Sequence, residues 1–264
     1  MKILNNEFEC DELEYIKEKI IFTFNPVGIG LSGSMARGDF HCHSDVDLEV
    51  FTQFPKDILC YEREVSHEIR GWSRPIIQSP QWTWDLHSRR LTFGVKGKRR
   101  RFDITITEPQ YPVIGSNYDE ITKDKLEIHI GGTYEMIQMI YGEHPLDEEI
   151  RSKFFPYYNE SLRKERLNII SAGLKKEIAK LEKKIEERDP NIFIAIHKIR
   201  KVFLQWLFIH HQIYPWSYEK RLDFQLGERL KISDSEIEII LLLGDRNLFL
   251  SAEFLSNYMR SRLS

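Results

Sequence analysis

The sequence has few cysteines and no long apolar segment, and each absence limits the class of protein. The 264 residues include three cysteines, Cys10, Cys42 and Cys60, and no C-x-x-C pair. This scatter predicts free thiols in a reducing compartment, because disulfide-stabilised domains carry even, closely spaced sets. The longest apolar run is far shorter than the ~20 residues that cross a bilayer, and the first residues lack the apolar core of a signal peptide. We therefore expect a cytoplasmic protein without membrane contact.

Neither sign of charge dominates the chain, but its two parts differ. Residues 1–150 contain 17 Lys and Arg against 26 Asp and Glu, whereas residues 151–264 contain 21 against 15. An acidic part suits divalent metal ions or a cationic substrate, and a basic part suits phosphate. Solvated helix faces account for much of the basic part.

Two patterns of hydrophobic spacing predict two domains. Residues 1–155 predict strands at 27–31, 46–51, 91–95 and 101–107, and helices at 11–22, 56–70, 131–141 and 145–155. From residue 159 onward, apolar residues recur every three or four positions, which predicts helices only. We therefore expect the α+β class, with an α+β domain at 1–155 and an all-α helical-bundle domain at 156–264.

A glycine-rich stretch admits a dinucleotide-binding interpretation, which its surroundings oppose. Residues 28–33 read Gly-Ile-Gly-Leu-Ser-Gly, and Asp47 follows nineteen residues after Gly28. That fingerprint needs a helix beginning at the third glycine and a crossover to a parallel strand. Residues 34–44 are interrupted by Gly38 and have no apolar face, so they cannot provide that helix. A dinucleotide site is not expected.

A second motif overlaps the first and predicts phosphate chemistry. Residues 33–38 read Gly-Ser-Met-Ala-Arg-Gly, and Asp45 and Asp47 follow on an alternating segment. Side chains at i and i+2 of a strand point the same way, so the two carboxylates share one face. Two carboxylates so close together repel each other, and a bound cation relieves this repulsion. Two Mg²⁺ ions about 3.5–4 Å apart commonly bind such acids. Gly33 and Ser34 expose backbone N–H groups and a hydroxyl to phosphate, and Arg37 adds a planar cationic donor.

These residues resemble a known signature. Gly-Ser-x-Ala-Arg-Gly followed by Ser-Asp-x-Asp-Leu is similar to the motif of the DNA polymerase β-type nucleotidyltransferases, and particularly to the bacterial branch of minimal nucleotidyltransferases and antibiotic-modifying adenylyltransferases. That family has a third carboxylate on a later strand, and Asp103 stands at this place on the alternating segment 101–107. The turn at 141–146 is also similar to the family, and the resemblance covers about residues 30–146.

The resemblance implies a fold and a set of roles. The fold would be a small mixed β-sheet flanked by helices, followed by a helical domain that closes the active-site cleft. Asp45 and Asp47 would bind two Mg²⁺ ions, and Asp103 would complete one metal site. Gly33, Ser34 and Arg37 would bind the phosphates, while the helical domain would lend a lysine. Lys220, in the aromatic and proline-containing loop 214–221, is the candidate for that lysine.

The implied reaction moves a nucleoside monophosphate, usually AMP from ATP in relatives although another NTP remains open, onto a hydroxyl. One hypothesis for the acceptor is a small molecule of the aminoglycoside or lincosamide type, since a cationic substrate suits the acidic part. A second is tRNA or a protein, as in some toxin–antitoxin systems. A third, of another class, is a catalytically inactive nucleotide-binding module. The presence of all three acids argues against this third hypothesis.

Other clusters have simpler explanations. The basic run Lys98–Arg101 could bind nucleic acid phosphates, but it is interpreted more simply as a solubilising feature of an edge strand. His41, Cys42 and His43 are too close together for one tetrahedral metal site and predict a solvated loop. Trp72, Trp82 and Trp84 could stack on a base, although core packing is commoner. The general base is open among Glu49, Glu135 and Asp103.

Overall fold

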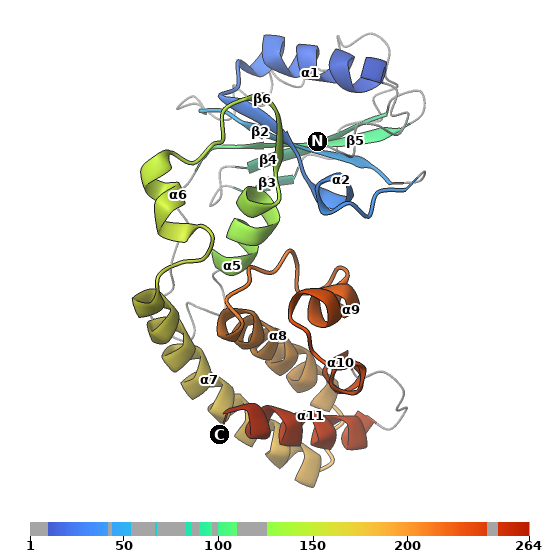
Figure 1. Ribbon diagram of the computed structural model, residues 1–264. Helices are drawn as coiled ribbons and strands as arrows, with labels where there is room; N and C mark the ends of the chain where they lie inside the picture. The colour runs from blue at the N-terminus through green and yellow to red at the C-terminus, as the bar shows by residue number, and fades with distance from the viewer. Residues whose placement is uncertain are drawn as a thin grey trace. The chain divides into compact units, whose positions relative to one another are not determined.

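The computed structural model describes residues 10–41, 44–53, 67, 83–85, 90–96, 100–109, 126–241 and 248–263. The chain divides into two compact units, Met1–Tyr111 with Gly132–Arg151, and Pro112–Gly131 with Ser152–Ser264 (Figure 1). The first unit contains a mixed sheet with helices and the second is helical, which confirms the predicted α+β class. The division of domains at residue 155 stays a prediction. No helix in the described ranges combines the length and apolar character needed to cross a bilayer.

The first unit is built on a sheet whose described strands have the order β3-β4-β5-β2-β1-β6. β2 and β5 are parallel, and the other neighbours are antiparallel. The elements are α1 (Cys10–Phe24), β1 (Gly28–Leu31), α2 (Gly33–Arg37), β2 (Val46–Phe51), β3 (Thr83–Asp85), β4 (Arg90–Lys96), β5 (Arg101–Thr107) and β6 (Gln138–Gly142). The antiparallel β1–β2 pair and the short α2 exclude the dinucleotide-binding unit, as expected from the sequence.

The two faces of the sheet differ in polarity because side chains alternate along each strand. One face carries Val46, Leu48 and Val50 of β2, which are buried in a core with Ile16 and Ile20 of α1. Figure 1 shows α1 lying along this face. On β2 the opposite face carries Asp47 and Glu49, and on β5 it carries Asp103, Thr105 and Thr107. The apolar face therefore stabilises the fold, which leaves the polar face for chemistry.

The predicted strands are confirmed, and one predicted helix is wrong. Strands were expected at 27–31, 46–51, 91–95 and 101–107, and β1, β2, β4 and β5 occupy these segments within one residue. The helix expected at 131–141 is instead a π-helical turn, η1 (Ile130–Glu135), followed by β6. β6 pairs with β1, so contacts distant in sequence provide its backbone hydrogen bonds. The helix expected at 56–70 lies outside the described residues.

Two further helices are as the sequence predicts. The helix expected at 11–22 is α1, and the one expected at 145–155 is the shorter α6 (Glu148–Phe154). In the second unit, α7 (Glu160–Glu186) ends shortly before Asp189 and Pro190, since proline cannot continue a helix. Asn159 caps the start of α7 by accepting a 2.9 Å hydrogen bond from the Leu162 N–H.

The second unit is a helical assembly in which α7, α8 (Ile192–His210) and α11 (Leu248–Leu263) pack together. Its other elements are α5 (Leu126–His129), α9 (Leu222–Phe224), the π-helical turn η2 (Gln225–Arg229) and α10 (Asp234–Leu241). A fully buried ion pair joins Glu127 of α5 to Arg166 of α7. Tyr158 and Gln205 each donate a 3.1 Å hydrogen bond to the same carboxylate. These partners compensate the desolvation of both charges, as a buried pair requires.

Candidate active site

The polar face of the sheet brings two of the predicted acids together. β2 and β5 are parallel neighbours, and their register places Asp47 directly beside Asp103. Since neighbouring strands lie about 4.8 Å apart, the two carboxylates rise side by side from one face. Both side chains are partly exposed. Asp45 is exposed and comes immediately before β2, so it belongs to the loop that leads into the strand.

Gly33 lies directly against the Asp47 carboxylate. A Cβ atom built on Gly33 would lie 2.6 Å from Cγ and 3.0 Å from Cβ of Asp47, and closer still to Oδ2. The backbone φ of Gly33 is +58°, a conformation that glycine adopts without strain. The Ser32 N–H also donates a 2.9 Å hydrogen bond to the Asp47 carbonyl. The turn at Gly33 and Ser34 and strand β2 are therefore packed together, and only glycine at position 33 leaves room for the Asp47 carboxylate.

Asp103 has a cationic partner from its own strand. The Arg101 Nε donates a 2.7 Å hydrogen bond to Asp103 Oδ1, and the side chains are 59% and 29% exposed respectively. This hydrogen bond, the negative charge of Asp103 and the more distant charge of Asp45 raise the pKa of Arg101. The guanidinium therefore remains charged, and it faces the acids that the sequence singles out.

Arg100 fixes the loop that carries Asp45. Its Nη1 donates to the carbonyls of His41 and Ser44, at 3.0 Å and 3.3 Å. Its guanidinium also stacks on Phe40, with 4.5 Å between Cζ and the ring centroid. These contacts correct the interpretation of the basic run as a solubilising edge feature, because Arg100 and Arg101 both have partners within this unit. Lys98 and Arg99 lie outside the described residues.

The remaining phosphate-binding candidates lie on α2. Ser34 and Arg37 are both half-buried. The Arg37 Nε donates a 3.1 Å hydrogen bond to Asp39, so this guanidinium is oriented by a carboxylate of the following loop. α2 ends at Gly38, whose φ of +79° gives the left-handed C-cap.

No described group of three or more acidic, histidine or cysteine side chains is arranged closely enough to hold a metal ion. The donor set still suits Mg²⁺, which prefers carboxylate oxygens. The Arg101 guanidinium forms an ion pair with the Asp103 carboxylate, so this carboxylate already binds a positively charged group. His41 is exposed, and its carbonyl accepts the hydrogen bond from Arg100. Cys42 and His43 lie outside the described residues, so the solvated-loop interpretation stays a prediction.

The candidates for a general base differ in exposure. Glu49 lies on the Asp47 face of β2 and is buried, and it accepts a 3.4 Å hydrogen bond from the Thr107 hydroxyl. Glu135 is exposed at the end of η1. Of the three tryptophans considered as a stacking surface, only the backbone of Trp84, in β3, lies within the described residues.

Lys220 lies in the second unit, on a loop held by one buried glutamine. Gln225 accepts a 2.8 Å hydrogen bond from the Trp216 N–H and donates 2.9 Å bonds to the carbonyls of Ser217 and Lys220. The Arg229 guanidinium stacks on Trp216 at 4.4 Å. The Lys220 side chain is exposed. The loop is thus well ordered by side chains that local sequence patterns do not reveal.

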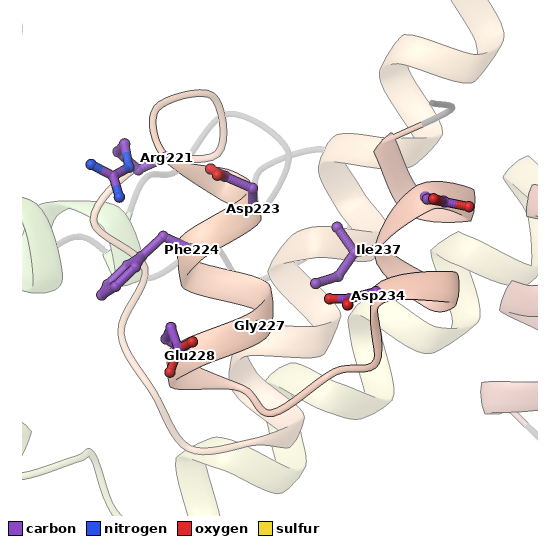
Figure 2. A pocket seen from close by; sticks show the side chains of 8 residues that line it. Arg221, Asp223, Phe224, Gly227, Glu228, Asp234 and Ile237 are labelled. Atoms are coloured by element: carbon purple, nitrogen blue, oxygen red, sulfur yellow. The ribbon is translucent and has the colours of Figure 1, made fainter. Parts of the chain in front are cut away.

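A pocket of about 420 Å³ in the second unit opens beside this loop, between η2 and α10 (Figure 2). Its lining is Arg221, Asp223, Phe224, Gly227, Glu228, Asp234, Ile237 and Glu238. Four of these side chains are carboxylates and one is cationic, so the charge of the lining disfavours a triphosphate. Lys220 is not among the lining residues.

Comparisons with known proteins give a family match and a structural match. Residues 13–129 match the family model described as nucleotidyltransferase domain, which confirms the resemblance carried by the Gly-Ser turn and the acids. Curated protein sequences give no significant match. One structural match is the crystal structure of spectinomycin adenyltransferase AAD(9) from Enterococcus faecialis with ATP and spectinomycin. The two sequences are 16% identical, and the match covers 96% of this chain and 98% of that chain with a TM-score of 0.35. A score of this size supports no inference about a shared site or substrate.

Proposed function

We propose that the chain transfers a nucleoside monophosphate, AMP from ATP, to a hydroxyl of a small cationic acceptor, because residues 13–129 match the family model of a nucleotidyltransferase domain. One observation carries this proposal: Asp47 and Asp103 rise in register from adjacent parallel strands, with the Gly33 turn against Asp47. Phosphoryl transfer depends mainly on positioning and charge neutralisation, and this arrangement provides rigid positions for both. The catalytic domain would comprise residues 1–155, and residues 156–264 would form the helical domain.

In the proposed reaction, the acceptor oxygen forms a bond to the α-phosphorus of the triphosphate. The bond from this phosphorus to the bridging oxygen breaks, and pyrophosphate leaves. The hydroxyl proton passes to a carboxylate on the polar face, for which Asp103 is better exposed than Glu49. Asp45, Asp47 and Asp103 would hold Mg²⁺, which neutralises the charge that develops on the phosphate oxygens.

The phosphates would be bound by groups on or near α2. The Gly33 backbone lies against the Asp47 carboxylate, Ser34 follows it directly, and Arg37 stands one helical turn further along. Arg37 is paired with Asp39, which would orient its guanidinium toward a phosphate oxygen. Lys220 would contribute a second cation from the helical unit. Buried Glu49, bonded to Thr107, would support the Asp47 strand.

The acidic balance of residues 1–150 favours a cationic acceptor, such as an aminoglycoside or a lincosamide. The alternative acceptors, tRNA or a protein, would need an exposed basic surface. The pairing of Arg100 with backbone carbonyls and of Arg101 with Asp103 leaves less of the basic run for that purpose. The presence of the acids on one face argues against an inactive nucleotide-binding module.

The test is a search for the transferred group. The full chain would be incubated with each NTP, Mg²⁺ and, separately, aminoglycosides, lincosamides or tRNA, and the products analysed by mass spectrometry. A nucleoside monophosphate added to a small cationic acceptor, with release of pyrophosphate, is the expected result, and Asp47→Asn should strongly reduce it. Modification of tRNA alone would replace the proposed acceptor, and no transfer to any acceptor would contradict the proposed function.

A further inference from the structure

Arg101 and Asp103 form an ion pair on the face of the sheet that is proposed to bind metal. Arg101 is the first residue of β5 and Asp103 is two residues later, so both side chains point to the polar face. The 2.7 Å hydrogen bond joins Arg101 Nε to Asp103 Oδ1. To bind a metal ion through this oxygen, Asp103 would have to exchange its hydrogen bond with Arg101 for the metal.

The neighbouring strand leaves space for this pair. Gly94 of β4 is the register partner of Asp103. A Cβ atom at Gly94 would lie 3.1 Å from Arg101 Nη2 and 3.2 Å from Asp103 Oδ1, which is tighter than ordinary contacts allow. The absence of a side chain at Gly94 therefore permits the guanidinium to lie flat over the strand and meet the carboxylate. The ion pair on β5 is thus accommodated by the glycine of the neighbouring strand β4.

The charges around the pair explain why a cation is needed there. Asp47 is beside Asp103 in register, and the charge of Asp45 also acts on Arg101. Without a metal, these acids would repel one another across the polar face. The Arg101 guanidinium reduces this repulsion. Its side chain is 59% exposed, so few contacts with neighbouring residues oppose a change of its rotamer.

We propose that Arg101 is a built-in counter-ion of the metal-free enzyme, which leaves Asp103 when metal binds and then contacts the anionic triphosphate. This inference rests on the proposed function, because it assumes that Asp103 is a metal ligand. It assigns Arg101 two successive partners, a carboxylate before metal binding and a phosphate after it. The exchange requires no change of protonation, since a guanidinium is always charged.

The proposal predicts opposite effects of one substitution on two ligands. Arg101→Gln removes the competing cation, so Mn²⁺ used as the probe should bind about two- to fivefold more tightly in the absence of nucleotide, the range expected for an exposed pair. In the presence of saturating Mn²⁺, the same variant should bind a non-hydrolysable ATP analogue more weakly. Water-proton relaxation would measure the first affinity, and calorimetry the second.

Two controls separate a specific exchange from a general effect of charge. Arg151→Gln removes one positive charge from the same unit at a residue whose ion pair is with Glu148, 3.9 Å away, and it should change neither affinity. In an Asp103→Asn background, Arg101→Gln should no longer tighten Mn²⁺ binding, because the pair is already broken.

Equal or weaker Mn²⁺ binding by Arg101→Gln, or tightening that persists in the Asp103→Asn background, would overturn the counter-ion role. Unchanged binding of the ATP analogue by Arg101→Gln would contradict the proposed contact between Arg101 and the triphosphate. These measurements need no acceptor, so they are distinct from the test of nucleotidyl transfer. If the wild type binds no Mn²⁺, the inference falls together with the metal assignment, even where transfer is observed.

Discussion

The contact between Gly33 and Asp47 allows a prediction whose two components can be separated. Gly33→Ala introduces a methyl group where Asp47 already lies, 2.6 Å from its Cγ. The carboxylate must therefore move, or the turn must open. Alanine at a φ of +58° also costs about 1–2 kcal/mol, because its Cβ crowds the following carbonyl. The variant should thus lose stability and, independently, the position of one catalytic acid.

Gly38→Ala provides a matched control at the C-cap of the same short helix. Its φ is +79°, so the backbone strain is comparable, but a Cβ atom there would meet nothing within 4 Å. Gly38→Ala should therefore lose about 1–2 kcal/mol of unfolding free energy from backbone strain, and Gly33→Ala should lose at least as much because it adds the overlap with Asp47. Only Gly33→Ala should lose activity strongly. Displacing a catalytic group by about 1 Å can reduce the rate roughly a hundredfold, and the loss should accompany weaker Mn²⁺ binding.

Urea unfolding followed by circular dichroism would measure stability, and release of pyrophosphate would measure activity at a temperature where both variants are folded. If Gly33→Ala retains as much activity as Gly38→Ala, the carboxylate of Asp47 does not need its position against the turn. If both variants lose activity equally, backbone strain in α2 explains the effect and the contact does not.

Three further substitutions test the other groups. Asp47→Asn should leave the fold intact and lower the transfer rate by roughly a hundredfold or more. Full activity of this variant would contradict the assignment of Asp47 as a metal ligand. Lys220→Ala should weaken NTP binding in calorimetry without affecting binding of the nucleoside. Equal NTP affinity of variant and wild type would show that Lys220 does not contact the triphosphate. Arg100→Met removes the hydrogen bonds to the His41 and Ser44 carbonyls, so Mn²⁺ affinity should fall about tenfold; an unchanged affinity would show that the Asp45 loop holds its shape without them.

The sequence predicts the part of the site that depends on local patterns. The alternation of residues 46–51 places Asp47 and Glu49 opposite the apolar residues of β2, and the same alternation places Asp103 on β5. The parallel pairing that brings Asp47 beside Asp103 cannot be obtained from either segment alone. It depends on the order of the strands, which the family resemblance implied only as a small mixed sheet.

Long-range contacts explain what the sequence did not reveal. Most of β6 lies in the segment 131–141 that was predicted as helix, whereas its pairing with β1 determines its conformation. The buried pair of Glu127 and Arg166 joins residues 39 positions apart, and each looks like an ordinary surface charge in its own helix. In the same way, Arg100 and Arg101 read as one basic run, although one binds loop carbonyls and the other a carboxylate.

The glycines of the first motif show how one pattern can have two physical causes. Gly28 and Gly30 match a dinucleotide fingerprint, but here they lie on β1 with antiparallel neighbours on both sides. A Cβ atom at Gly28 would lie 2.4 Å from the Glu143 carbonyl oxygen and 2.6 Å from the Met139 side chain, and one at Gly30 would overlap Ile137. These glycines therefore make room for β6 and the residues on either side of it, whereas Gly33 makes room for the Asp47 carboxylate. Only the third glycine of the motif belongs to the candidate active site, and substitutions at the first two should alter stability without the specific loss of metal binding expected at Gly33.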